Sequence, residues 1–221
     1  MVGLMLGNLL TFADIGWGVS LALWVAFVTI VISKYVAKRT TIYVARKAIH
    51  MLGGGFVAII SPFVFSSPLM PIIDSYLLMG VLLYVKLRKK EFNWFQEQGN
   101  YGEVFFTFSF GTLLLIMWVI EPMYWFSKDV FIAILPLIFM SFGDGITGII
   151  RNYIYKRRVK GFWGSIGMLI FCTIAGYLIF SIPGLIAGIV ATAVEVFPLI
   201  DDNLTIPFSS FLVLYLLIKV V

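Results

Sequence analysis

One acidic residue inside an apolar run is the first feature of the sequence that could do chemistry. The stretch Met140 to Ser165, MSFGDGITGIIRNYIYKRRVKGFWGS, puts Asp144 at the end of a strongly apolar run. An acid in a membrane segment costs about 2.5–3.5 kcal/mol on insertion scales, so it is tolerated mainly where it has a partner or a task. Its neighbours are small, and glycine lets a backbone approach a ligand closely. We therefore expect a cation and phosphate site where this helix ends.

Other acids stand at the ends of apolar runs. Mg²⁺ prefers hard oxygen ligands, usually one or two carboxylates with waters and substrate phosphates. Asp144, Asp201, Asp202 and Glu195 are the predicted metal ligands, and Asn203 is predicted to orient a water or a nucleotide. The alternative for 201–203 is a solvated turn between helices, because Asp and Asn are common turn formers.

Basic residues follow Asp144 before the next apolar run begins. Arg and Lys bind phosphate groups, and Arg does so with bidentate geometry. Gly164 and Ser165 open the next helix, whose free N–H groups favour an anion. The alternative is an ordinary basic loop beside a membrane span. The basic residues of this loop are Arg151, Lys156, Arg157, Arg158 and Lys160.

The composition indicates an integral membrane protein. Of 221 residues, 61% are hydrophobic and 12% are charged, and the mean hydropathy is +1.03. A span needs about 20 apolar residues, so residues 1–221 fit a single membrane domain with no separate soluble domain. The net charge of +5 lies in short loops and predicts no nucleic-acid binding. The single cysteine, Cys172, excludes an internal disulfide and a cysteine metal cluster.

Apolar runs separated by polar or proline-containing breaks predict an all-α bundle with about eight spans. The polar stretch Lys86 to Gly102 is predicted to be a helix that lies at the headgroup level. The eight predicted spans are Trp17 to Tyr35, Ala48 to Phe65, Leu69 to Val85, Glu103 to Ile120, Val130 to Gly148, Phe162 to Phe180, Pro183 to Pro198 and Thr205 to Val221.

The distribution of positive charge predicts the orientation. Fourteen of the sixteen Lys and Arg residues fall on alternate loops, which are therefore expected in the cytosol, with the N-terminus outside. This topology gathers at one membrane face the residues that enter the second span (Arg46, Lys47 and His50), Glu103 at the start of the fourth, and the predicted metal ligands with Asn203. His50 is a candidate general base because it shares a helix face with Arg46, although a single histidine is more often structural.

Four pieces of the sequence resemble the CTP-dependent lipid kinases, the family of dolichol kinase, phytol kinase and the CTP-dependent diacylglycerol kinase, which is related to the membrane CTP:phosphatidate cytidylyltransferases. The last piece is the most specific, because an acid followed by Asp-Asp-Asn and a proline-containing helix start is the family's C-terminal signature. The pieces are RKAIH at 46–50, GEVFF at 102–106, FGDGITGIIR at 142–151 leading into KGFWGS at 160–165, and EVFPLIDDNLTIPF at 195–208.

The resemblance implies transfer of the γ-phosphate of CTP to the hydroxyl of a long isoprenoid alcohol or a related lipid, with Mg²⁺, at the cytosolic face of a cell or endoplasmic-reticulum-type membrane. By position it implies that Asp144, Asp201, Asp202 and Asn203 bind metal and nucleotide, with Asp144 or Asp202 taking or orienting the alcohol's proton. Lys160 and Ser165 resemble phosphate contacts, supported by Glu195, Glu103 and His50.

The chain departs from the family pattern at one acidic position. Relatives commonly have Lys-Ser/Thr-x-Glu-Gly-Ser, where this chain has Trp163 in place of the acid. Either that acid is not essential here or another residue, such as Glu195, replaces it. Two rival functions are a membrane cytidylyltransferase, which would attack the α-phosphorus and leave a CDP-lipid, and a small-solute transporter. The absence of an internal sequence repeat disfavours the transporter.

Overall fold

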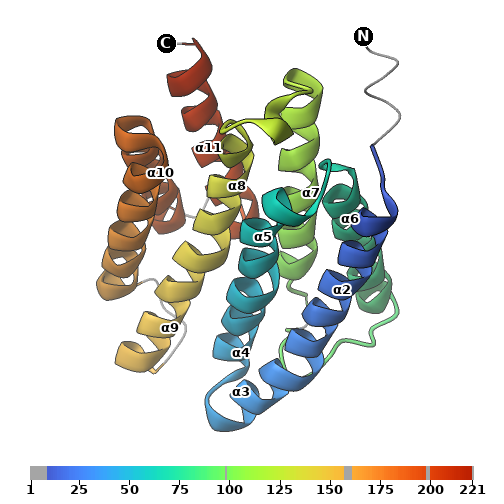
Figure 1. The fold of residues 1–221 in the computed structure, drawn as a ribbon. Helices are drawn as coiled ribbons and strands as arrows, with labels where there is room; N and C mark the ends of the chain where they lie inside the picture. The colour runs from blue at the N-terminus through green and yellow to red at the C-terminus, as the bar shows by residue number, and fades with distance from the viewer. Residues whose placement is uncertain (1–8, 98, 157–160, 198–199, 221) are drawn as a thin grey trace.

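The computed structural model describes residues 9–97, 99–156, 161–197 and 200–220, and Figure 1 shows the fold. Throughout these ranges the regular elements are helical and no strand occurs. Seven of the described helices are long and apolar enough to cross a membrane. The prediction of an all-α polytopic bundle is therefore confirmed.

Most of the long helices consist of consecutive segments, some of them π-helical. The elements in chain order are α2 (Phe12–Phe27), η2 (Val28–Ile32), α3 (Ser33–Arg39), α4 (Ile42–Ala48), η3 (Ile49–Gly55), α5 (Phe56–Val64), α6 (Leu69–Leu87), α7 (Gly102–Ile120), η4 (Tyr124–Phe126), α8 (Val130–Ile138), η5 (Phe139–Gly143), α9 (Asp144–Tyr155), α10 (Phe162–Val196), α11 (Asp202–Tyr215) and η6 (Leu216–Val220).

Element α10 contains two of the predicted spans. A straight helix of 35 residues would be about 50 Å long, well beyond a bilayer core of about 30 Å. The helical dihedral angles are lost at Phe180 and Ser181, where Ser181 has φ of 52°. Gly176 then packs against the backbone of Gly184, which only a reversal of the chain allows. The two arms, 162–179 and 182–196, form an antiparallel hairpin, which agrees with the two spans predicted in this stretch, whereas length and composition count α10 as one of the seven candidate membrane helices.

The fifth span forms the centre of the bundle. In the most apolar stretch of this span, Val130–Tyr155, 83% of the residues are buried. The corresponding share in the first span, Phe12–Arg39, is 17%. Elements α8, η5 and α9 are packed against α4, α5, α7, α10 and α11. The exposed apolar side chains of the outer helices, such as Leu23 and Leu178, are suited to face lipid.

The start of α2 and the end of η6 lie at one end of the bundle, and the α3–α4 connection and the end of α9 lie at the other (Figure 1). Most of the described basic residues lie on or beside the helix ends at this second end, which we call the basic end. These regions are α3 and α4 on either side of their turn, the segment that follows α6, and the end of α9. The pattern supports the predicted alternation of loops, while the orientation relative to the cell remains a prediction.

The prediction of a headgroup-level helix between Lys86 and Gly102 is wrong. Helix α6 continues to Leu87, and the described residues that follow form turns until α7 begins at Gly102. Side-chain anchors, rather than helix formation, fix this segment, because Trp94 Nε1 donates to the carbonyl oxygen of Thr29 at 3.0 Å. Phe95 is buried at 2% exposure. Charge and aromatic content did not distinguish an anchored turn from an interfacial helix.

The first helix starts earlier than predicted, at Phe12, because Thr11 and Asp14 form a capping box. Asp14 Oδ1 also accepts from the backbone N–H of Ser66 at 2.7 Å, which ties this helix to the α5–α6 connection. At the same end, Tyr124 donates to the carbonyl oxygen of Leu114 at 3.0 Å. Burial raises the pKa of the Tyr124 phenol above its usual range, so the group stays a donor.

Candidate functional site

Nine buried polar residues from six helices lie together toward the basic end of the bundle, and we call them the buried polar layer. Each is at most 7% exposed. Charges buried this deeply are tolerated only when they are paired, and the layer contains both signs. Its members are Arg46, Lys47, His50, Lys86, Glu103, Asp144, Arg151, Glu195 and Asn203.

The first cluster joins the second span to the fifth. Lys47 Nζ donates to Asp144 Oδ2, and His50 Nδ1 lies 4.0 Å from the same oxygen. Glycine makes the approach possible, because a Cβ at Gly148 would meet the Lys47 side chain at 2.6 Å. Gly145 faces Met51 in the same way. The glycines after Asp144 therefore bring α9 close enough to α4 to bury this ion pair.

His50 is the least satisfied member of this cluster. Its ring packs against Phe106 with centroids 4.4 Å apart, and neither ring nitrogen has a hydrogen-bond partner among the described residues. The hydroxyl of Ser141, on η5, is buried and equally without a partner. Segments η3 and η5, which carry His50 and Ser141, pack against each other. A ligand hydroxyl or a water would complete this set of hydrogen bonds.

The second cluster joins the end of the fifth span to both arms of the α10 hairpin. Arg151 Nη1 donates to Glu195 Oε1 at 2.8 Å, and Nη2 donates to Glu195 Oε2 at 3.2 Å and to Ser165 Oγ at 3.0 Å. Gly164 lies under the guanidinium, where a Cβ would meet Arg151 Nε at 2.7 Å. Glu195 reaches Arg151 only because the chain reverses at Ser181. This pair partly neutralises the cation predicted to bind phosphate.

The third cluster surrounds Glu103 at the start of α7. Arg46 Nε lies 3.3 Å from Glu103 Oε1, and Lys86 Nζ lies 3.8 Å from Glu103 Oε2. Arg46 Nη2 also donates to Asn100 Oδ1 at 3.2 Å. Ser109 Oγ donates to the carbonyl oxygen of Asn203 at 2.6 Å, which fixes the start of α11 against α7.

The acids at 201 and 202 begin a helix. Asp201 is the N-cap of α11, and its Oδ1 accepts from Asn203 N at 2.9 Å and Asn203 Nδ2 at 2.8 Å. Asp202 is the first helical residue, and both acids are half-buried. The alternative of a solvated turn therefore describes only part of 201–203, because Asn203 lies within the buried polar layer.

The structure does not gather the four predicted metal ligands into one group. Within the described ranges, no three His, Cys, Asp or Glu residues lie close enough to hold a metal ion. Asp144 and Glu195 each face a cation instead. Because Mg²⁺ often takes only one or two protein carboxylates, the magnesium site remains a prediction. Arg158 and Lys160, both predicted phosphate contacts, lie outside the described residues.

Sequence reasoning missed two members of the site. Lys86 was counted only as a basic residue beside a loop, yet its side chain is buried and its Nζ donates to the carbonyl oxygen of Glu97 at 3.2 Å. Its place near the end of an apolar span, before the exposed Lys89 and Lys90, was the available signal. Ser141 gave no signal, because a serine in an apolar helix usually bonds to its own backbone.

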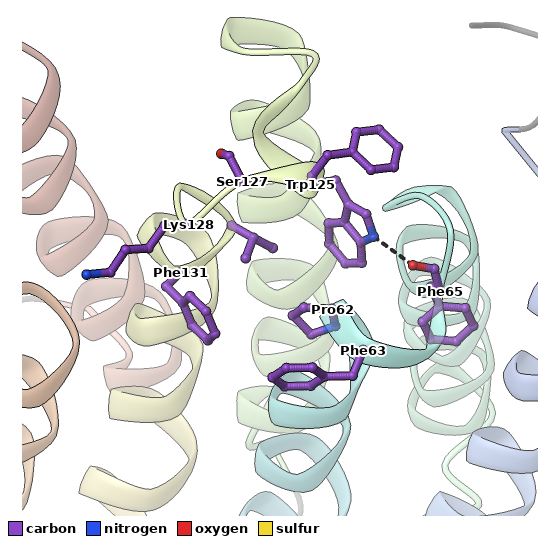
Figure 2. A pocket seen from close by; sticks show the side chains of 9 residues that line it. Pro62, Phe63, Phe65, Trp125, Ser127, Lys128 and Phe131 are labelled. Atoms are coloured by element: carbon purple, nitrogen blue, oxygen red, sulfur yellow. Dashed lines mark hydrogen bonds between the residues drawn. The ribbon is translucent and has the colours of Figure 1, made fainter.

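A separate cavity of about 490 Å³ lies at the opposite end of the bundle (Figure 2). Its lining is mostly aromatic and aliphatic, and Trp125 Nε1 donates to the carbonyl oxygen of Phe65 at 2.9 Å beside it. It contains no acid or histidine, so we place no chemistry there. The lining residues are Pro62, Phe63, Phe65, Trp125, Phe126, Ser127, Lys128, Val130 and Phe131.

Comparison of the chain with models of protein families, with curated proteins and with solved structures found no match. The resemblance to the CTP-dependent lipid kinases therefore rests on the four sequence pieces alone.

Proposed function

We propose that this chain is a membrane lipid kinase that transfers the γ-phosphate of CTP to the hydroxyl of an isoprenoid alcohol at the cytosolic face. One observation carries the proposal: residues from all four kinase-like sequence pieces contribute to the buried polar layer. Lys47 contacts Asp144 across 97 positions of sequence, and Arg151 contacts Glu195 across 44. Loop charges that only set membrane orientation have no need of such contacts.

The chemistry of phosphoryl transfer suits this arrangement. The reaction depends mainly on positioning and on neutralising phosphate charge. The alcohol oxygen attacks the γ-phosphorus, the bond from that phosphorus to the β–γ bridging oxygen breaks, and CDP leaves with the bonding electrons. The basic end supplies cations for the phosphates, and apolar helix faces lie beside it for the lipid chain.

The proton of the attacking hydroxyl needs an acceptor. His50 is suited to this role because neither of its ring nitrogens has a hydrogen-bond partner among the described residues. Asp144, 4.0 Å from Nδ1, would stabilise the imidazolium that forms. Lys47 holds Asp144 in place through their ion pair. A bound Mg²⁺ would neutralise charge on the β- and γ-phosphates, and the half-buried carboxylates of Asp201 and Asp202 are suited to hold it.

Two labelled nucleotides test the proposal. Purified protein is incubated with γ-labelled or α-labelled CTP and a panel of polyprenols, geranylgeraniol and diacylglycerol. We expect label in the lipid from the γ position only. Label from the α position would instead indicate cytidylyl transfer.

Two variants at opposite ends of the bundle test the site, one within it and one as a control. Asp202→Asn is expected to lower transfer at least about tenfold, through lost charge stabilisation in the transition state. Asp129→Asn, at the exposed outer pair with Lys219, is expected to keep full activity. Full activity in both His50→Gln and Asp202→Asn would refute the assignment.

A further inference from the structure

Four buried polar atoms in the third cluster have no hydrogen-bond partner among the described residues. They are the Nε of Arg46, both carboxylate oxygens of Glu103 and the Oδ1 of Asn203. Each residue is at most 6% exposed, so bulk water does not satisfy these atoms. A buried polar group without a hydrogen bond is unfavourable. Several such atoms in one place indicate that a ligand completes the set.

Three helices meet at this point around Gly102. A Cβ there would lie 3.0 Å from Asn203 Nδ2 and would overlap Arg46 Nη2. Glycine therefore lets α4 and α11 approach the start of α7. Asn100 Oδ1 accepts from Gly102 N at 2.9 Å and holds the adjoining segment.

The four atoms without a hydrogen bond are three acceptors and one donor, and these types narrow the chemistry of the ligand. Two ion pairs lie among them, because Arg46 Nε is 3.3 Å from Glu103 Oε1 and Lys86 Nζ is 3.8 Å from Glu103 Oε2. Glu103 contributes two acceptors, Asn203 contributes one, and Arg46 Nε is the donor. The amide orientation of Asn203 is fixed because its Nδ2 donates to Asp201. A ligand edge with an amino group beside a ring nitrogen complements Asn203 Oδ1, one Glu103 oxygen and Arg46 Nε, because the amino group offers two N–H donors and the ring nitrogen accepts. The other oxygen of the Glu103 carboxylate faces a cation of the cluster.

We propose that this corner of the buried polar layer binds the base of the nucleotide and selects cytosine over uracil, an inference that rests on the proposed function. The 4-amino group of cytosine donates to Glu103 and to Asn203 Oδ1, and Arg46 Nε donates to the ring nitrogen N3. Uracil presents a carbonyl oxygen and an N–H at these positions. Its carbonyl would face a carboxylate, and Arg46 would lose its acceptor, so uracil is rejected.

The ratio of kcat/KM for CTP to that for UTP measures this selection. Glu103→Gln keeps the shape of the side chain but adds an amide donor that suits the uracil carbonyl. We expect the CTP/UTP ratio to fall at least about tenfold. Glu121→Gln, at the exposed outer pair with Lys219, is the matched control and should keep the wild-type ratio.

A second variant covers the case in which Glu103→Gln fails to fold. Gly102→Ala adds one methyl group against Arg46 and Asn203, and we expect it to raise the KM for CTP several-fold while kcat changes little. An unchanged KM in Gly102→Ala, or an unchanged CTP/UTP ratio in a folded Glu103→Gln, would overturn the inference.

Thermal unfolding with added nucleotide separates the inference from the proposed function. If the wild-type protein transfers no phosphate but CTP raises its Tm more than UTP does, and Glu103→Gln removes the difference, the base site stands and the kinase proposal fails. If CTP and UTP raise the wild-type Tm equally or not at all, the base site is refuted, whatever the outcome of the transfer assay.

Discussion

Buried ion pairs are the main feature at the scale of single residues. Glu103, Asp144 and Glu195 each lie within 4.0 Å of at least one buried Lys or Arg. Taking such groups out of water costs several kcal/mol per ion, so these pairs contribute little net stability. Well-packed apolar residues of similar volume would serve stability equally well. The pairs are therefore better explained by a need for fixed charges at this position in the fold.

The Arg151–Glu195 pair provides a test of this view. Glu195→Leu leaves the Arg151 charge buried without its bidentate partner, and we expect a loss of about 3–5 kcal/mol in the free energy of unfolding. The double variant Arg151→Leu/Glu195→Leu should recover most of this loss while transfer activity stays absent. Melting in detergent gives the stability. Glu121→Leu, at a pair that is about one-third exposed, should cost under about 1 kcal/mol. A double variant less stable than Glu195→Leu would contradict the expectation.

The residues that could do chemistry were mostly recognisable before the fold was known. Asp144, Glu195 and His50 stand out because they interrupt apolar runs. Their partners were not recognisable, because Lys47 and Arg151 look like any basic residue beside a span. Pairing depends on which helices touch, and no local pattern carries that information.

At the scale of elements, the α10 hairpin decides which residues share the site. It returns Glu195 to the end of the bundle where Ser165 lies. Three glycines permit its close packing: Gly176 meets Gly184, and Gly188 meets the backbone of Cys172. The sequence predicted two spans here because Pro183 interrupts the apolar run, but their contact through glycine faces required the structure.

A methyl group inside the hairpin should disturb it. In Gly184→Ala the new Cβ meets the backbone oxygen of Gly176, so the two arms must separate, and we expect a loss of about 1–3 kcal/mol. Gly80→Ala is the control, because nothing lies within 4 Å of that position in α6. It should leave stability unchanged or raise it by up to about 1 kcal/mol through helix propensity. Equal melting temperatures for the two variants would show that the arms do not pack in this way.

Two π-helical segments, η3 and η5, pack against each other beside the first cluster. Segment η3 carries His50, and η5 ends at the residue before Asp144. Such segments are uncommon and occur often at functional sites. The apolar pattern of the sequence did not predict these segments. A π-helical turn holds one more residue than an α-helical turn, and this difference leaves the composition of the segment unchanged.

At the scale of the whole molecule, the two ends of the bundle differ in chemistry. The basic end holds the buried polar layer and most of the described basic residues. The opposite end holds the apolar cavity and the exposed contacts of Lys219 with Glu121 and Asp129, both at 2.8 Å. Substrates with phosphate groups are therefore expected to approach from the basic end.

Cysteine labelling in sealed vesicles tests this polarity. Cys172 is buried and should not react with a membrane-impermeant reagent. We expect Arg39→Cys and Arg88→Cys to be labelled from the cytosolic side and Phe126→Cys from the other side, because the three exposed positions lie at opposite ends of the bundle. If positions 39 and 88 are labelled from different sides, the eight-crossing topology is wrong.

The sequence by itself determined the membrane class, the helical fold and the gathering of polar residues toward one end of the bundle. These follow from hydrophobicity, span length and charge bias, which act residue by residue and need no knowledge of neighbours. Only the tertiary structure decided that Lys47 pairs with Asp144, that Arg151 pairs with Glu195, and that several buried atoms around Gly102 have no hydrogen-bond partner among the described residues. Such choices depend on how closely two helices approach, and that distance is set by packing across the bundle rather than along the chain.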